Sequence, residues 1–279
     1  MSLLSVLASR ALLLACTVPS APVPGYTLAW SDEFSVNGWP DPRNWTYERG
    51  FVRNQEFQWY QANNAVVKNG MLVIEARWEA RPNPAFEAGA ADWKRNRQQA
   101  EFTSASLTTR GLHSWRYGRF EMRARIDVRA GMWPAFWTVG DGGRWPASGE
   151  IDIMEYYRGN LLANVAWAGE TPGKSMWDDS RKPIAELGDA NWSRRFHVWR
   201  MDWNEDEIRI TVDDVLLNTI DLRQTVNGDG TGRNPLREPH HIILNLAVGG
   251  TNGGDPAATT FPARYEIDYV RVYQKAAAP

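Results

Sequence analysis

Two adjacent stretches decide the fold of this chain: FHVWRMDW at residues 196–203 and EIRITV at residues 207–212. Apolar and polar side chains alternate in both, as they do in a β-strand, where successive side chains point to opposite faces of the sheet. Asp213 and Asp214 follow at once and are typical of a tight turn. The pattern predicts two short strands that end at a turn.

The same pattern recurs along the chain, and helical periodicity is never sustained for long. Further β-rich runs occupy residues 71–76, 118–126, 241–248 and 265–273, and clusters of Gly, Asn, Asp and Pro separate them. The sequence therefore predicts an all-β fold, an antiparallel sandwich of two sheets.

Length and composition fit one large domain. The chain has 279 residues, 43% of them hydrophobic, so it can bury a sizeable core.

Its single cysteine, Cys16, excludes an intrachain disulfide. A formal net charge of -2, without a long basic run, gives no electrostatic case for nucleic acid. The 15 tryptophans are unusual, because indole faces suit the apolar faces of sugar rings as well as a core.

Residues 1–21 resemble an export signal, which predicts a secreted, periplasmic or membrane-anchored protein. The segment is apolar and lacks acidic residues, although Arg10 interrupts the apolar run. The sequence before Cys16 resembles a lipoprotein signal, in which this cysteine carries a lipid anchor. Ordinary cleavage near Ala21 is the alternative. The apolar run is too short to span a membrane as a helix.

The rest of the chain divides into a linker, a folded domain and a tail. Residues 22–25 read as a short linker, residues 26–275 as the folded domain, and residues 276–279 as a disordered tail. No second linker and no internal repeat interrupt the domain.

The candidate catalytic residues lie in the segment GEIDIMEY at residues 149–156. Strand alternation places Glu150 and Asp152 on one face and would place Glu155 on the other. A β-bulge that absorbs Met154 as an extra residue returns Glu155 to the acidic face. The prediction is three carboxylates on one face of a single strand.

Three like charges on one strand face repel, so at least one carboxyl should have a raised pKa. Such a carboxyl can protonate a leaving sugar oxygen while an ionised neighbour attacks the anomeric carbon. A retaining glycosidase holds these two groups roughly 5–5.5 Å apart, a distance that two glutamates on a bulged strand can reach. The pattern favours this reaction over a purely structural role.

The segment resembles the active-site strand of glycoside hydrolase family 16 in its bulged form, Glu-x-Asp-x-x-Glu. Six further segments resemble landmarks of that family and occur in the same order, at residues 30–34, 58–60, 118–121, 131–137, 244–250 and 268–273. The resemblance covers nearly all of residues 26–274.

The resemblance implies a β-jelly-roll sandwich of the concanavalin A-like type with a concave substrate cleft. It implies Glu150 as nucleophile, Asp152 as its helper and Glu155 as acid/base. The substrate-binding residues that it implies are Trp133, Trp137 and Trp145 as stacking surfaces on the donor side, and Asn54 as a hydrogen-bonding residue. The chemistry needs no cofactor, and we expect the protein to act as a monomer.

A structural calcium ion is frequent in the family. By position its ligands here would be Glu33, the carbonyl of Gly70 and Asp268, and oxygen ligands suit calcium. Each of these residues also fits an ordinary turn or strand.

Within the family the chain most resembles the laminarinase-like branch, which cuts β-1,3-glucan internally. Laminarinase-like sequences commonly carry Arg where this chain has Ser106, and His in the strand after the catalytic one. Here that strand offers Asn164 and Trp167 for the acceptor side instead. Mixed-linkage β-glucan and algal galactans such as agar, porphyran and carrageenan therefore stay open as substrates. Transglycosylation on the same site also stays open, and so does a non-catalytic carbohydrate-binding protein, because a fold does not settle function.

Overall fold

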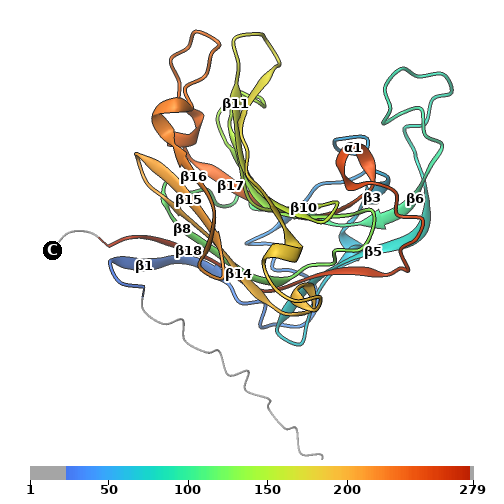
Figure 1. Cartoon of the computed structure of the whole chain (residues 1–279). Coiled ribbons are helices and arrows are strands. Elements are labelled where there is room, and N and C mark those ends of the chain that lie inside the picture. Colours follow the sequence, from blue (N-terminus) through green and yellow to red (C-terminus); the bar gives the residue numbers. More distant parts are fainter. Residues whose placement is uncertain (1–22, 277–279) are drawn as a thin grey trace, which may run out of the picture.

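The computed structural model describes residues 23–276, which form two stacked β-sheets (Figure 1). The predicted all-β sandwich is confirmed. The predicted export signal, with Cys16, lies outside the described residues.

One layer is a ten-stranded sheet with the order β16-β15-β14-β8-β18-β5-β6-β3, to which β1 and β4 add through β18 and β5. Its strands are β1 (Tyr26–Asp32), β3 (Gln58–Tyr60), β4 (Ala65–Lys68), β5 (Met71–Pro82), β6 (Gln99–Ser104), β8 (Gly118–Arg125), β14 (His197–Trp203), β15 (Glu207–Val212), β16 (Val215–Asp221) and β18 (Ala263–Lys275).

The other layer is an eight-stranded sheet with the order β12-β11-β10-β9-β17-β7-β2, and β13 pairs with β11. Its strands are β2 (Thr46–Tyr47), β7 (Ser106–Thr108), β9 (Met132–Gly140), β10 (Glu150–Tyr157), β11 (Asn160–Ala168), β12 (Ser175–Asp178), β13 (Arg181–Pro183) and β17 (His240–Val248).

The alternating stretches at residues 196–203 and 207–212 form the antiparallel pair β14 and β15, with Trp199 opposite Val212. Trp199, Met201 and Trp203 are buried, while the residues between them are only partly buried. These side chains share one core cluster with Ile151 of the other sheet. Alternation thus builds the core between the two sheets, because each sheet turns one apolar face inward.

The connections are short helical turns and long loops. The structure contains one four-residue α-helix, α1 (Gly250–Gly253), and 3-10 turns at Ala62–Asn64, Ile184–Glu186, Trp192–Arg194, Leu222–Gln224 and Pro235–Arg237 among the described residues. Within residues 23–276, no helix has the length and apolar character needed to cross a membrane. Loops between β11 and β12, β16 and β17, and β5 and β6 project from the same side of the sandwich (Figure 1).

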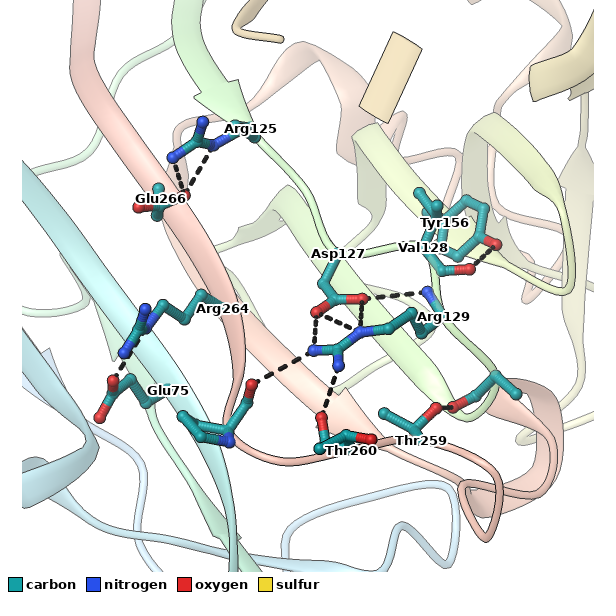
Figure 2. A network of polar contacts seen from close by, with 12 residues as sticks. Glu75, Arg125, Asp127, Val128, Arg129, Tyr156, Thr259, Thr260, Arg264 and Glu266 are labelled. Carbon is teal, nitrogen blue, oxygen red and sulfur yellow. Dashed lines mark hydrogen bonds and ion pairs between the residues drawn. The ribbon is translucent and has the colours of Figure 1, made fainter. Parts of the chain in front are cut away.

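A polar network ties the loop before β9 to its neighbours (Figure 2). Arg129 pairs with Asp127 and donates to the carbonyl of Thr260. The hydroxyl of Tyr156, on β10, donates to the carbonyl of Val128 at 2.7 Å. The end of β10 is therefore fixed to the loop that leads into β9.

Candidate active site

The acidic segment forms β10, in the interior of the eight-stranded sheet between β9 and β11. Asp152 pairs with Asn164 on β11 and Glu155 pairs with Leu162, so two residues of β10 oppose the single residue between these partners. The register against β9 shifts between Asp152 and Met154. This irregularity confirms the predicted bulge.

The bulge separates the side chains of β10 into two sets. Ile153 and Met154 are both fully buried in the core between the sheets. Glu150, Asp152 and Glu155 instead line a cleft on the opposite face of the sheet. The three carboxylates therefore share one face, because consecutive residues Ile153 and Met154 both turn inward.

The cleft has a volume of about 1160 Å³. All eight strands of the sheet contribute residues to it, for example Tyr47 from β2, Thr108 from β7, Asn245 from β17, Trp137 from β9, Glu150 from β10, Asn164 from β11, Trp177 from β12 and Arg181 from β13. The cleft thus extends across the sheet from one edge to the other, with the carboxylates in between.

Glu155 is held by neutral donors. The indole N–H of Trp133 donates to its Oε1 at 2.7 Å, and the amide of Asn164 donates to its Oε2 at 3.3 Å. Burial raises the pKa of Glu155 to about 7, the bond from Trp133 opposes this rise, and the charge of Glu150 adds to it. Glu155 can therefore keep a proton near neutral pH.

Burial also raises the pKa of Glu150 to about 7, and the positive charge of Arg53 opposes this rise. Asp152 has a pKa well above its usual range, because it is buried and lies near both glutamates. The three carboxyls share protons as one coupled group. Near neutral pH such a group holds both an acid and an ionised carboxylate, which is the pair that glycosidic cleavage requires.

The three tryptophans expected to stack on sugars all line the cleft. Trp145 is 47% exposed, whereas Trp133 and Trp137 are 5% and 8% exposed. Trp133 is engaged with Glu155, and the guanidinium of Arg53 lies 5.0 Å from the ring centroid of Trp137. Trp145 therefore offers the most open indole surface of the three.

Asn54 and Asn164 also line the cleft, as expected. The prediction for Trp167 is wrong, because this residue belongs to the core cluster and does not line the cleft. Asn164 and Trp167 are an odd number of residues apart on β11, so strand alternation turns them to opposite faces.

Several cleft residues were not predicted: Arg53, Tyr157, Trp177 and Arg181. Tyr157 follows Glu155 by two positions, so alternation beyond the bulge could have placed it. Arg53, Trp177 and Arg181 lie outside β10, and only the packing of separate segments brings them to the carboxylates.

The carboxylates proposed as calcium ligands are each paired with an arginine. Arg271 donates to both oxygens of Glu33 at 2.8 Å, and Arg123 donates to Asp268 at 2.5 Å. Among residues 23–276, no group of three or more His, Cys, Asp or Glu side chains could hold a metal ion. The donor atoms are oxygens, which suits calcium, but two guanidinium groups already balance the charge.

Comparison with known sequences places this geometry among enzymes that act on polysaccharides. Residues 53–271 match the model of "Glycosyl hydrolases family 16". A β-glucanase of Rhodothermus marinus is 38% identical over 271 residues, which cover 90% of this chain and 86% of that protein.

Solved structures agree with the sequence comparison. The laminarinase catalytic domain of Thermotoga maritima is 33% identical, with a TM-score of 0.74 over 90% of this chain and 99% of that one. A structure from work on endo-acting O-glycanases of the human gut microbiota, which initiate mucin breakdown, is 34% identical, with a TM-score of 0.83 over 92% and 94% of the two chains. The chain is a member of glycoside hydrolase family 16.

Proposed function

We propose that this protein is a retaining, endo-acting glycoside hydrolase that cleaves a β-linked polysaccharide, with β-1,3-glucan as the leading substrate. The observation that carries the proposal is the set of three coupled carboxylates, Glu150, Asp152 and Glu155, on one face of the bulged strand in a cleft. The glucanase relatives support the class of substrate.

In the first step the carboxylate of Glu150 attacks the anomeric carbon of the donor sugar. Glu155 gives its proton to the glycosidic oxygen, so the C–O bond breaks and the acceptor sugar leaves. Asp152 lies between the two in sequence on the same face and shares their protons, which lets it support the ionised form of Glu150 during attack.

In the second step Glu155, now ionised, removes a proton from water. The resulting hydroxide adds to the anomeric carbon and displaces Glu150, which restores the starting protonation states. A sugar hydroxyl could replace water in this step, and transglycosylation is therefore an alternative outcome on the same residues.

Endo action follows from the shape of the cleft. Because the cleft receives residues from both edges of the sheet, a chain can lie across the carboxylates with sugar units on both sides. A closed pocket, in contrast, would admit only a chain end.

A second candidate substrate is a mucin-type or galactan chain. The structure related to endo-acting O-glycanases has the higher TM-score of the two solved structures compared above, 0.83 against 0.74. Ser106, and a strand β11 without histidine, are the departures from the laminarinase-like pattern that keep this candidate open.

The test is to incubate the protein with laminarin, lichenan, agarose, porphyran, carrageenan and gastric mucin, and to size the products. Oligosaccharides from laminarin support the leading proposal, and cleavage of mucin or a galactan alone supports the second candidate. Monosaccharides as the only early products would contradict endo action.

Glu150→Ser is the matched control for this experiment. We expect a loss of activity on the order of 10³-fold or more, with folding intact, because the covalent intermediate cannot form. Turnover equal to wild type in this variant would reject Glu150 as the nucleophile.

Export, lipid attachment at Cys16 and a monomeric state remain proposals that rest on the sequence. Mass spectrometry of the mature protein tests the first two, since lipidation adds a defined mass to Cys16 and ordinary cleavage removes that residue. Sedimentation of the purified domain tests the third.

A structural calcium ion held by Glu33, Gly70 and Asp268 also remains a proposal. The arginine partners of the two carboxylates weigh against it. A higher unfolding temperature in calcium than in EDTA would support the ion, and equal temperatures would indicate that Arg271 and Arg123 suffice.

A further inference from the structure

Arg53 lies beside the catalytic strand although it comes from a distant part of the chain. It follows β2, lines the cleft, and places its guanidinium 5.0 Å from the ring centroid of Trp137. Trp137 on β9 is the cross-strand partner of Asp152 on β10. The guanidinium therefore covers the indole that adjoins the carboxylates.

Glu48 and Ser106 hold Arg53 in position. Its guanidinium forms an ion pair with Glu48, and both side chains are only 22% exposed. The hydroxyl of Ser106 donates to Glu48 at 2.6 Å. Ser106 is the residue at which this chain departs from the laminarinase-like pattern, and here it orients the carboxylate that holds Arg53.

The ion pair with Glu48 leaves part of the Arg53 guanidinium without a hydrogen-bond partner among the described residues. The Nη1 atom of Arg53 is buried and has no hydrogen-bond partner among residues 23–276. A buried charge that is incompletely paired acts strongly on its neighbours, because little water screens it. Burial alone would favour the protonated form of Glu150, so a nearby cation has a clear role.

The charged and titratable groups around the carboxylates come from several elements. They are Tyr47, Glu48, Arg53 and Glu56 from β2 and the segment after it, Arg110 after β7, Asp141 and Arg144 after β9, Asp152, Glu155 and Tyr157 from β10, Asp179 and Arg181 from the segment of β12 and β13, and His241 from β17. Two of the cations act on different glutamates. The charge of Arg53 lowers the pKa of Glu150, and the charge of Arg181 lowers the pKa of Glu155.

We propose that Arg53 is a positioning residue of the active site, whose guanidinium, fixed by Glu48 over Trp137, keeps Glu150 in the ionised and nucleophilic form. The proposal rests on the retaining mechanism above. Arg53 acts through Glu150 and needs no bond to the substrate.

The kinetic test compares the pH dependence of kcat/KM for wild type, Arg53→Met, Arg53→Lys and Arg181→Met. Glu150 must be ionised, so the acid limb of the profile reports its pKa. Arg53→Met should move this limb to higher pH by about one unit, because an opposite charge is removed. Arg53→Lys keeps the charge and should restore most of the shift.

Arg181→Met is the matched control, since it removes a cation on the other side of the carboxylates. It should move the basic limb, which reports protonated Glu155, and move the acid limb less than Arg53→Met does, because the carboxyls titrate as one coupled group. Equal movement of the acid limb in both variants would overturn the specific role of Arg53.

A direct titration separates this proposal from the proposed function. The pKa of Glu150 can be followed by ¹³C NMR of labelled glutamate carboxyls without substrate, with Glu150→Gln to assign the signal. A higher pKa in Arg53→Met supports the proposal, and an unchanged pKa overturns it, whether or not any polysaccharide is cut.

Loss of Arg53 leaves Glu48 without its cation and could unfold the protein. The double variant Arg53→Met with Glu48→Gln removes both charges and should fold. Because Glu48 is neutralised too, a raised pKa of Glu150 in the double variant would still assign the effect to Arg53.

Discussion

At the scale of single residues, the chemistry depends on the unequal surroundings of similar carboxyls. Glu155 accepts hydrogen bonds from neutral donors, Trp133 and Asn164, whereas Glu150 lies within the field of Arg53. The bond from Trp133 and the charge of Arg181 favour ionised Glu155, and Arg53 favours ionised Glu150, while burial opposes the ionisation of both. Because the pKa values of both glutamates are raised to about 7, the group can hold one protonated and one ionised glutamate near neutral pH.

The role of Glu155 predicts a dependence on the leaving group. Glu155→Ala should reduce turnover of polysaccharide by roughly 10²- to 10⁴-fold, because the sugar oxygen leaves without a proton. An aryl glycoside with an acidic phenol needs little protonation and should lose much less. Equal losses on the two substrates, measured as kcat/KM, would argue against Glu155 as the acid.

The raised pKa values also predict how stability changes with pH. Glu155 keeps its proton in the folded state up to a pKa of about 7, whereas the ordinary pKa of a glutamate is 4.5. The folded state then binds more protons than the unfolded state between these values, so stability falls as pH rises through this window.

Glu155→Gln should remove that loss. We expect the variant to match wild type near pH 4.5 and to exceed its free energy of unfolding at pH 8 by about 1–2 kcal/mol. Urea unfolding across this range is the measurement. A variant that is less stable than wild type at pH 8 would show that burial of the ionised Glu155 does not destabilise the fold.

At the scale of the element, β10 combines a core face and a catalytic face through one extra residue. The bulge at Ile153 and Met154 lets both apolar side chains turn inward while Glu155 rejoins the acidic face. The hydroxyl of Tyr156 anchors the end of the strand to Val128 (Figure 2). This bond holds the part of the strand that follows the bulge.

Deletion of Met154 tests the role of the bulge. A regular strand without the bulge still places Glu150, Asp152 and the shifted glutamate on one face. We expect measurable hydrolysis, with a loss of stability of about 2–5 kcal/mol from the missing buried side chain.

Insertion of one alanine after Ile153 is the opposite change. The glutamate then follows Asp152 by four residues, so a regular strand without the bulge returns it to the acidic face, and we expect measurable hydrolysis. A folded insertion variant without activity would indicate that the bulge is kept and turns the glutamate toward the core, and no activity in either folded variant would contradict the bulge as the device that sets the face.

At the scale of the whole molecule, the cleft is longer than the group of carboxylates. Trp145 and Trp177 both line the cleft, and their ring centroids are 6.4 Å apart. Their side chains are 47% and 42% exposed. Such exposed indoles can stack on sugar units away from the bond that is cut.

Trp177→Ala should therefore raise KM for the polymer several-fold and change kcat little, because a remote contact contributes equally to substrate and transition state. A short oligosaccharide that does not reach Trp177 should be unaffected. Trp78→Ala is the control, since Trp78 is 68% exposed and does not line the cleft. A similar rise in KM in both variants would exclude a specific subsite at Trp177.

The amino-acid sequence determined the all-β fold, the carboxylate strand and its bulge, because these depend on side-chain alternation between near neighbours. The pattern at residues 196–212 and the spacing of Glu150, Asp152 and Glu155 are local properties of this kind. The family also followed from the sequence, since its landmarks keep their order along the chain.

Only the tertiary structure decided which other residues meet the carboxylates. Arg53 and Trp177 are far from β10 in sequence and reach the cleft through the pairing of strands into one sheet. Trp167 was expected in the cleft because it lies on the strand after the catalytic one, yet the phase of β11 turns it into the core. Glu150 and Glu155 were fixed by local geometry, but their pKa values depend on burial and on charges brought in by distant segments.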